Sequence, residues 1–96
     1  MTALATPEIG KTVVAKGIST NFLEVGSGEP VVFIHGSGPG VTAYANWRLT
    51  LPVLADRFHC LAPDMVGFGF TERPEGFRYT LQNWVDQLLG FLDALG

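Results

Sequence analysis

The sequence predicts an α/β fold whose sheet begins with antiparallel strands. Apolar β-type runs come first and then alternate with helical patterns, and one continuous apolar run ends in a glycine-rich loop. The 96 residues are 47% hydrophobic and only 16% charged, which favours a folded unit over a disordered segment. This length suffices for one small domain.

The first strands are expected to pair at an edge of the sheet. Residues 1–10 have no apolar block and are interpreted as a leader, with residues 11–96 as the structured unit. A short β-type run ends near Gly17, and a second run covers 20–25. The tight turn between them predicts antiparallel pairing.

The following elements alternate strand and helix. The run 31–34 is rich in β-branched residues and predicts a strand buried on both faces, as in a parallel sheet covered by helices. A helical pattern begins at Ala43, and Pro52 should kink or restart it because proline has no N–H to donate. Residues 58–62 predict another strand, and the glycines and proline of 65–76 predict a loop.

The last element is an amphipathic helix. Thr80 is a suitable N-cap and Gly96 suits the C-terminus. Since such a helix should lead into another strand, and an open apolar strand edge favours unwanted pairing, we expect a truncated piece of a longer protein. Its apolar residues recur at steps of three and four and are predicted to form one buried stripe: Leu81, Trp84, Val85, Leu88, Leu89, Leu92 and Leu95.

Charge and composition exclude several classes of function. The net charge is −3 without any Lys/Arg cluster, which argues against nucleic acid and anionic membranes as partners. The single cysteine, Cys60, cannot form an intrachain disulfide and is expected to pack as a small buried side chain. With no signal-peptide pattern and no long apolar segment, the sequence predicts a cytoplasmic protein.

A glycine-rich loop carries the chemistry. His-Gly-Ser-Gly-Pro-Gly at 35–40 lies where a strand gives way to a helix, and ligands of open α/β sheets bind beyond such strand ends. Backbone N–H groups in such a loop can stabilise an oxyanion. A dinucleotide fingerprint fails because Val41 replaces its third glycine, and a phosphate-binding P-loop would need a lysine. A glycine-rich turn without function stays an alternative for this loop alone.

A second loop, Pro-Asp-Met-Val-Gly-Phe-Gly at 63–69, follows the next strand. Together the two loops resemble the α/β-hydrolase fold, which implies its N-terminal part: the first four strands and first two helices of a mostly parallel sheet. Residues 35–43, followed by Asn-Trp-Arg at 46–48, resemble the meta-cleavage product hydrolases, particularly the 2-hydroxymuconate-semialdehyde hydrolases.

This resemblance implies roles for a few residues. The backbone N–H of Ser37 would be one oxyanion-hole donor, and Gly36, Ser37, Gly38 and Asn46 would contact substrate. For Asn46, a plain asparagine near a helix N-terminus is an equal alternative. His35 is expected to hold the loop by a hydrogen bond, since the catalytic histidine of this fold follows the nucleophile and the acid in the chain.

For the whole protein, the resemblance implies serine-type C–C bond hydrolysis of a small dienol or dienoate ketone or aldehyde. It implies no metal, no organic cofactor and a homo-oligomer. The nucleophile, the acid and the catalytic histidine are not among the 96 residues, so this chain alone is expected to be inactive. Two alternatives remain open: another α/β hydrolase, such as an esterase or epoxide hydrolase, and a non-catalytic binding domain.

Overall fold

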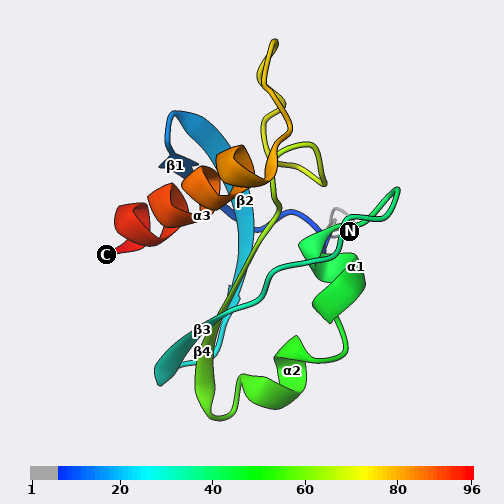
Figure 1. Ribbon diagram of the computed structural model, residues 1–96. Coiled ribbons are helices and arrows are strands. Elements are labelled where there is room, and N and C mark those ends of the chain that lie inside the picture. Colours follow the sequence, from blue (N-terminus) through cyan, green and yellow to red (C-terminus); the bar gives the residue numbers. More distant parts are fainter. Residues whose placement is uncertain (1–6) are drawn as a thin grey trace, which may run out of the picture.

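The computed structural model describes residues 7–96, so residues 1–6 of the predicted leader lie outside it. These residues form a mixed four-stranded sheet of order β1-β2-β4-β3 with helices on both faces (Figure 1). The elements are β1 (Lys11–Ala15), β2 (Ile18–Val25), β3 (Glu29–Val32), α1 (Ala43–Trp47), α2 (Leu51–Leu54), β4 (Phe58–Pro63) and α3 (Leu81–Leu95).

The predicted antiparallel start of the sheet is confirmed. Ala15 of β1 pairs with Ile18 of β2, which leaves a two-residue turn. Both turn residues, Lys16 at φ 53° and Gly17 at φ 77°, adopt left-handed backbone, as in the turns that match the twist of a hairpin. β2 also pairs antiparallel with β4, and in the described range parallel pairing is confined to β3 and β4.

The expectation of a strand buried on both faces is wrong for 31–34. β3 lies at the sheet edge, where Val31 and Val32 are half-buried and Ile34 is exposed. The strand also starts earlier, at Glu29, and includes Pro30, a residue that an edge strand tolerates because one side of its ladder is unpaired. The buried strand is β4, which lies between β2 and β3.

Alternating side chains build a core on each face of the sheet. On the face covered by α1 and α2, Cys60 and Ala62 pack with Phe33 and Leu51. On the other face, Leu61 packs with Phe91 of α3 and with further residues of β1 and β2. The fold therefore has three layers, with the sheet in the middle (Figure 1).

The short helices begin as the sequence predicts. Pro52 lies in the first turn of α2, so the helical pattern restarts there after α1 has ended. The Oγ1 of Thr42 caps α1 by accepting a hydrogen bond from Ala45 N at 2.9 Å. Thr80 caps α3 in the same way, with 3.1 Å between its Oγ1 and Asn83 N.

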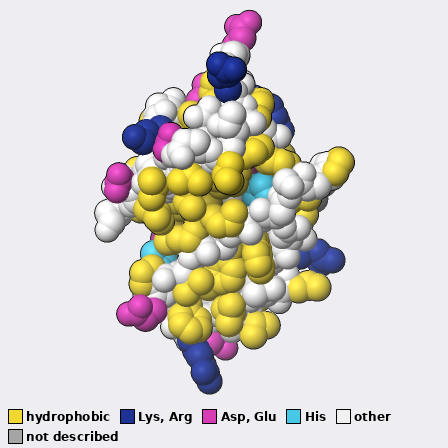
Figure 2. Space-filling model, viewed as in Figure 1, with side chains coloured by type: hydrophobic (Ala, Val, Ile, Leu, Met, Phe, Trp, Pro, Cys, Tyr) yellow, Lys and Arg dark blue, Asp and Glu magenta, His cyan; other side chains and the backbone are white. Residues whose placement is uncertain are grey.

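The predicted buried stripe of α3 is wrong for five of its seven residues, while Trp84 and Leu88 are half-buried. The residues of α3 that are fully buried are Gln87, Gly90 and Phe91. A Cβ on Gly90 would lie 2.7 Å from Lys16 Cγ and 2.9 Å from Lys16 N, so α3 crosses the β1–β2 turn at its glycine. Figure 2 shows hydrophobic side chains gathered on the surface over α3, where five members of the predicted stripe are exposed: Leu81, Val85, Leu89, Leu92 and Leu95.

Candidate functional site

Two loops meet beyond the carboxyl ends of β3 and β4, and His35 links them. Its Nε2 accepts a hydrogen bond from Met65 N at 2.9 Å, which requires the ring proton to be on Nδ1. Nδ1 then donates to the carbonyl oxygen of Gly36 at 2.5 Å. The ring also packs edge-on against Phe68, with 4.9 Å between the centroids. The predicted loop-holding role of His35 is thus visible as a defined tautomer.

The buried carboxylate of Asp64 organises the base of the site. Oδ1 accepts from Ala43 N at 2.8 Å, and Oδ2 accepts from Asn21 Nδ2 and Phe70 N, both at 3.0 Å. The residue is 1% exposed, and three donors offset the cost of burying its charge. No hydrogen bond joins it to His35 or Ser37 within residues 7–96, so these three residues do not form a triad.

Further buried polar side chains were missed by sequence reasoning. Gln87 accepts from Val66 N at 2.9 Å and donates to Thr20 Oγ1 at 3.3 Å, which ties α3 to the loop after β4. Thr71 Oγ1 donates to the carbonyl of Asp64 at 2.6 Å. The burial of Gln87 could have been predicted from its spacing, because it falls three residues after Trp84 and four before Phe91, on one side of a helix.

The site residues predicted from the sequence come together around the first loop. Ser37 borders a cavity of about 160 Å³, and its backbone N–H has no hydrogen-bond partner among residues 7–96. Asn46 Oδ1 accepts from Gly36 N at 2.6 Å, and the Gly38 carbonyl accepts from Val41 N at 3.2 Å. The cavity is lined by Ile34, His35, Gly36, Ser37, Met65, Phe68 and Trp84.

In the loop at 35–40, one glycine adopts a backbone conformation that favours glycine. Gly40 has a φ of 74°, in the left-handed region that glycine adopts most readily. Gly36 and Gly38 do not lie in that region, and a Cβ there would meet single side-chain atoms at 3.6 and 3.5 Å. The structure therefore demands no glycine at 36 or 38 on conformational grounds.

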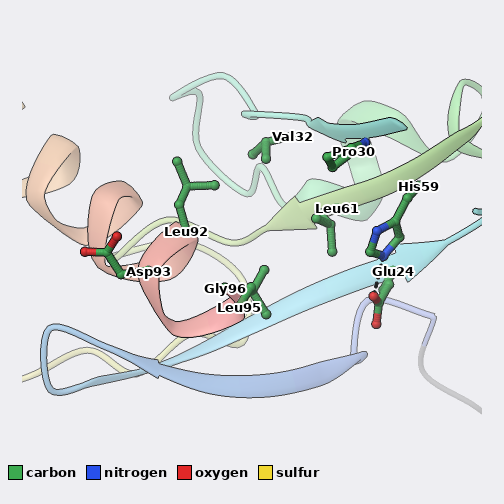
Figure 3. Close-up of a pocket in the computed structure, with 9 residues that line it drawn as sticks. All are labelled: Glu24, Pro30, Val32, His59, Leu61, Leu92, Asp93, Leu95 and Gly96. Carbon is green, nitrogen blue, oxygen red and sulfur yellow. Dashed lines mark hydrogen bonds and ion pairs between the residues drawn. The ribbon is translucent and has the colours of Figure 1, made fainter. Parts of the chain in front are cut away.

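A larger cavity of about 600 Å³ lies away from this loop, between the end of α3 and the sheet (Figure 3). Two of the three ionisable side chains that line it pair with each other, as Glu24 Oε2 lies 2.5 Å from His59 Nε2, and the third is Asp93 of α3. A hydrogen bond from Lys11 and then one from His59 hold the pKa of Glu24 below its usual value. Apolar side chains of β3, β4 and α3 make up most of the remaining wall.

The part of the chain that the structure describes offers neither a reactive thiol nor a cluster of metal ligands. Cys60 is fully buried, and burial raises the pKa of its thiol, which disfavours a reactive thiolate. Residues 7–96 hold no group of three His, Cys, Asp or Glu side chains arranged for a metal ion. Nor does any helix there have the length and apolar character to cross a membrane.

The family model of the alpha/beta hydrolase fold matches residues 29–96, so the chain belongs to the α/β-hydrolase fold family. A 2-hydroxy-6-oxo-2,4-heptadienoate hydrolase of Pseudomonas putida strain F1 is 59% identical over 88 residues, or 92% of this chain and 32% of the relative. A 2-hydroxymuconate semialdehyde hydrolase of Pseudomonas sp. strain CF600 is 55% identical over 89 residues, or 93% and 31%.

A solved structure agrees with these relatives. The meta-cleavage product hydrolase of Pseudomonas fluorescens IP01 superposes with a TM-score of 0.90 at 59% identity, over 92% of this chain and 32% of that one. The predicted resemblance to meta-cleavage product hydrolases is confirmed. The chain spans about a third of the length of the relatives it matches.

Proposed function

We propose that the whole protein hydrolyses a C–C bond in meta-ring-cleavage products of the 2-hydroxymuconic semialdehyde type. One observation carries the proposal: Ser37, whose backbone N–H has no hydrogen-bond partner among residues 7–96, borders a cavity at the strand ends. The identity of 59% to a hydrolase of 2-hydroxy-6-oxo-2,4-heptadienoate supports the substrate class.

The proposed reaction is of the serine type. Water adds across the C–C bond next to a carbonyl group, so the hydroxyl joins the acyl carbon and a proton joins the carbon that leaves. The Ser37 N–H would stabilise the oxyanion formed on the way, and one such donor typically contributes about 100- to 1,000-fold to kcat. The second donor would be the N–H of the residue after the nucleophile, outside the 96 residues.

Substrate contacts are assigned to the same loop. Gly36 lines the cavity and Gly38 follows Ser37 in the same loop. The Nδ2 of Asn46, on α1, has no hydrogen-bond partner among residues 7–96. An amide N–H₂ is a suitable donor to the oxygen atoms of a dienoate. We assign Asn46 Nδ2 to this contact.

The domain and cellular assignments are part of the proposal. Residues 11–96 would be the N-terminal part of the core domain, and 1–10 a leader. Part of that leader is held to the sheet, since Asn21 Nδ2 donates to the Glu8 carbonyl at 2.8 Å and Gly10 N donates to Asn21 Oδ1 at 2.9 Å. We also propose a cytoplasmic homo-oligomer as the whole protein, and an inactive 96-residue chain.

The decay of the dienoate chromophore tests the function. The whole protein should bleach 2-hydroxymuconic semialdehyde. The rate of bleaching by the 96-residue chain should not exceed that of a heat-killed control. Ser37→Pro removes the backbone donor and should lower kcat by about 100-fold or more. The matched variant Ser37→Ala keeps the N–H and should lose far less. Equal rates for Ser37→Pro and the unaltered protein would refute the oxyanion role, and no bleaching by the whole protein would refute the substrate class.

A further inference from the structure

Gly36 is held by two hydrogen bonds, one on each side of its Cα. Its N–H donates to Asn46 Oδ1 at 2.6 Å, and its carbonyl oxygen accepts from His35 Nδ1 at 2.5 Å. The N–H belongs to the peptide plane before Gly36 and the carbonyl to the plane after it. Since a peptide unit is planar, each bond fixes the direction of a whole plane.

The second of these planes also carries the Ser37 N–H. In a trans peptide this N–H points opposite to the Gly36 carbonyl, so its direction follows the second plane, which His35 contacts directly. The first plane, which Asn46 contacts, sets the position from which the second plane extends, because the two planes join at the Cα of Gly36. Glycine has no Cβ to restrict its backbone, and Gly36 would rotate more freely than other residues without outside contacts. The side chains of His35 and Asn46 supply those contacts.

Asn46 is itself rigidly mounted. It lies on α1, whose first residue, Ala43, donates its N–H to Asp64 Oδ1 at 2.8 Å. The neighbouring Trp47 packs edge-on against Phe33, with 5.1 Å between the ring centroids, which holds the rotation of the helix. The side-chain oxygen must face Gly36, because an N–H cannot donate to the amide N–H₂.

We propose that Asn46 is a positioning residue for the oxyanion hole: its Oδ1 holds the peptide plane before Gly36 and thereby aims the Ser37 N–H. This inference rests on the proposed function of Ser37 and adds a second task for Asn46. The two tasks use different atoms, with Oδ1 positioning the loop and Nδ2 left for the substrate.

The two tasks separate in the kinetics of the whole protein. Asn46→Ala removes both atoms and should lower kcat about tenfold, the effect of one lost hydrogen bond, while also raising KM. Asn46→Asp keeps an acceptor oxygen and should recover most of that kcat, while KM rises further because its carboxylate repels the dienoate. If Asn46→Asp has a kcat as low as that of Asn46→Ala, the positioning role is overturned.

A second readout needs no substrate. His35-Gly36 is the one His-Gly pair among the 96 residues, so in this 96-residue chain labelling histidine carbonyls with ¹³C and glycine nitrogens with ¹⁵N selects the Gly36 amide. Its proton should move upfield and exchange faster in Asn46→Ala, but not in Asn46→Asp. Asn83→Ala, which removes an amide bonded to the Arg78 carbonyl instead, is the matched control and should change neither readout.

The two readouts also separate the two proposals. An unchanged Gly36 amide in Asn46→Ala would overturn the positioning role whatever the enzyme does. If Asn46→Ala changes the chemical shift or exchange rate of the Gly36 amide but the whole protein cleaves no dienoate, the contact between Asn46 and Gly36 stands and the proposed function is rejected.

Discussion

Gly69 lies directly against the carboxylate of Asp64, so closely that a Cβ on Gly69 would overlap both carboxylate oxygens. The glycine also has a φ of 55°, in the left-handed region. Because three donors hold the carboxylate in place, it cannot move aside without losing hydrogen bonds.

Gly69→Ala should therefore destabilise the fold by more than backbone strain alone. Left-handed strain for a residue with a Cβ costs about 1–3 kcal/mol, and displacement of Asp64 adds to it. Gly76→Ala is the matched control, since Gly76 has a φ of 78° but nothing within 4 Å of an added Cβ. Urea denaturation measures both variants, and equal losses would contradict the close contact.

Asp64→Asn should lower the free energy of unfolding although the two side chains have nearly the same shape. The new N–H₂ group would face a backbone donor and leave it without an acceptor, at about 1–3 kcal/mol for each buried group left unpaired. Asp56→Asn, at an exposed position, serves as control. A loss no larger than that of the control, by thermal or urea denaturation, would show that the carboxylate is not needed.

The stabilising contribution of Glu24 should be lost in acid. Its lowered pKa means that the folded state favours the ionised carboxylate, through Lys11 first and His59 second. The resulting stability is present above the ordinary pKa of a glutamate and disappears as the pH falls through the lowered pKa. Since Lys11 is largely exposed, the contribution is expected to be about 1 kcal/mol or less.

The measurement is the free energy of unfolding as a function of pH for the unaltered protein and for Glu24→Gln. The difference between them should be constant near neutral pH and shrink in acid. Glu75→Gln, at an exposed glutamate, should give no such trend. A difference that grows as the pH falls would have the wrong sign for this mechanism.

The two faces of α3 should respond differently to truncation. Phe91 is 1% exposed and packs edge-on against Phe22 at 5.2 Å between centroids, so Phe91→Ala should cost about 3–5 kcal/mol. Leu89 is 51% exposed, and Leu89→Ala should change stability by about 0.5 kcal/mol or less. Comparable losses of unfolding free energy in the two variants would support the buried stripe that the sequence alone predicted.

That stripe shows where sequence reasoning fell short. The spacing of the leucines located the helix and Thr80 located its start, because both are local signals. The buried face was set by the close approach of Gly90 to Lys16, a tertiary contact between residues far apart in the chain. Hydrophobic spacing counts a glycine as neutral and cannot detect such an approach.

The candidate site was predictable to a similar extent. Strand order and loop composition placed the loop at 35–40 beside the one after β4, and the structure brings them together through His35. The role of Asp64 was missed, since a lone aspartate in a glycine-rich loop has the pattern of a solvated residue. Its hydrogen-bond donors come from β2, α1 and its own loop, an arrangement that no local pattern encodes.

The links that Asp64 makes also bear on the order in which the molecule folds. Its donors Asn21 and Ala43 lie 43 and 21 positions away along the chain, so these bonds join segments that are far apart in the sequence. Contacts between distant residues form late because the loops that separate them must first be closed. The site loops should thus be among the last segments to become ordered, and their amides should gain protection in refolding experiments only when the sheet is complete.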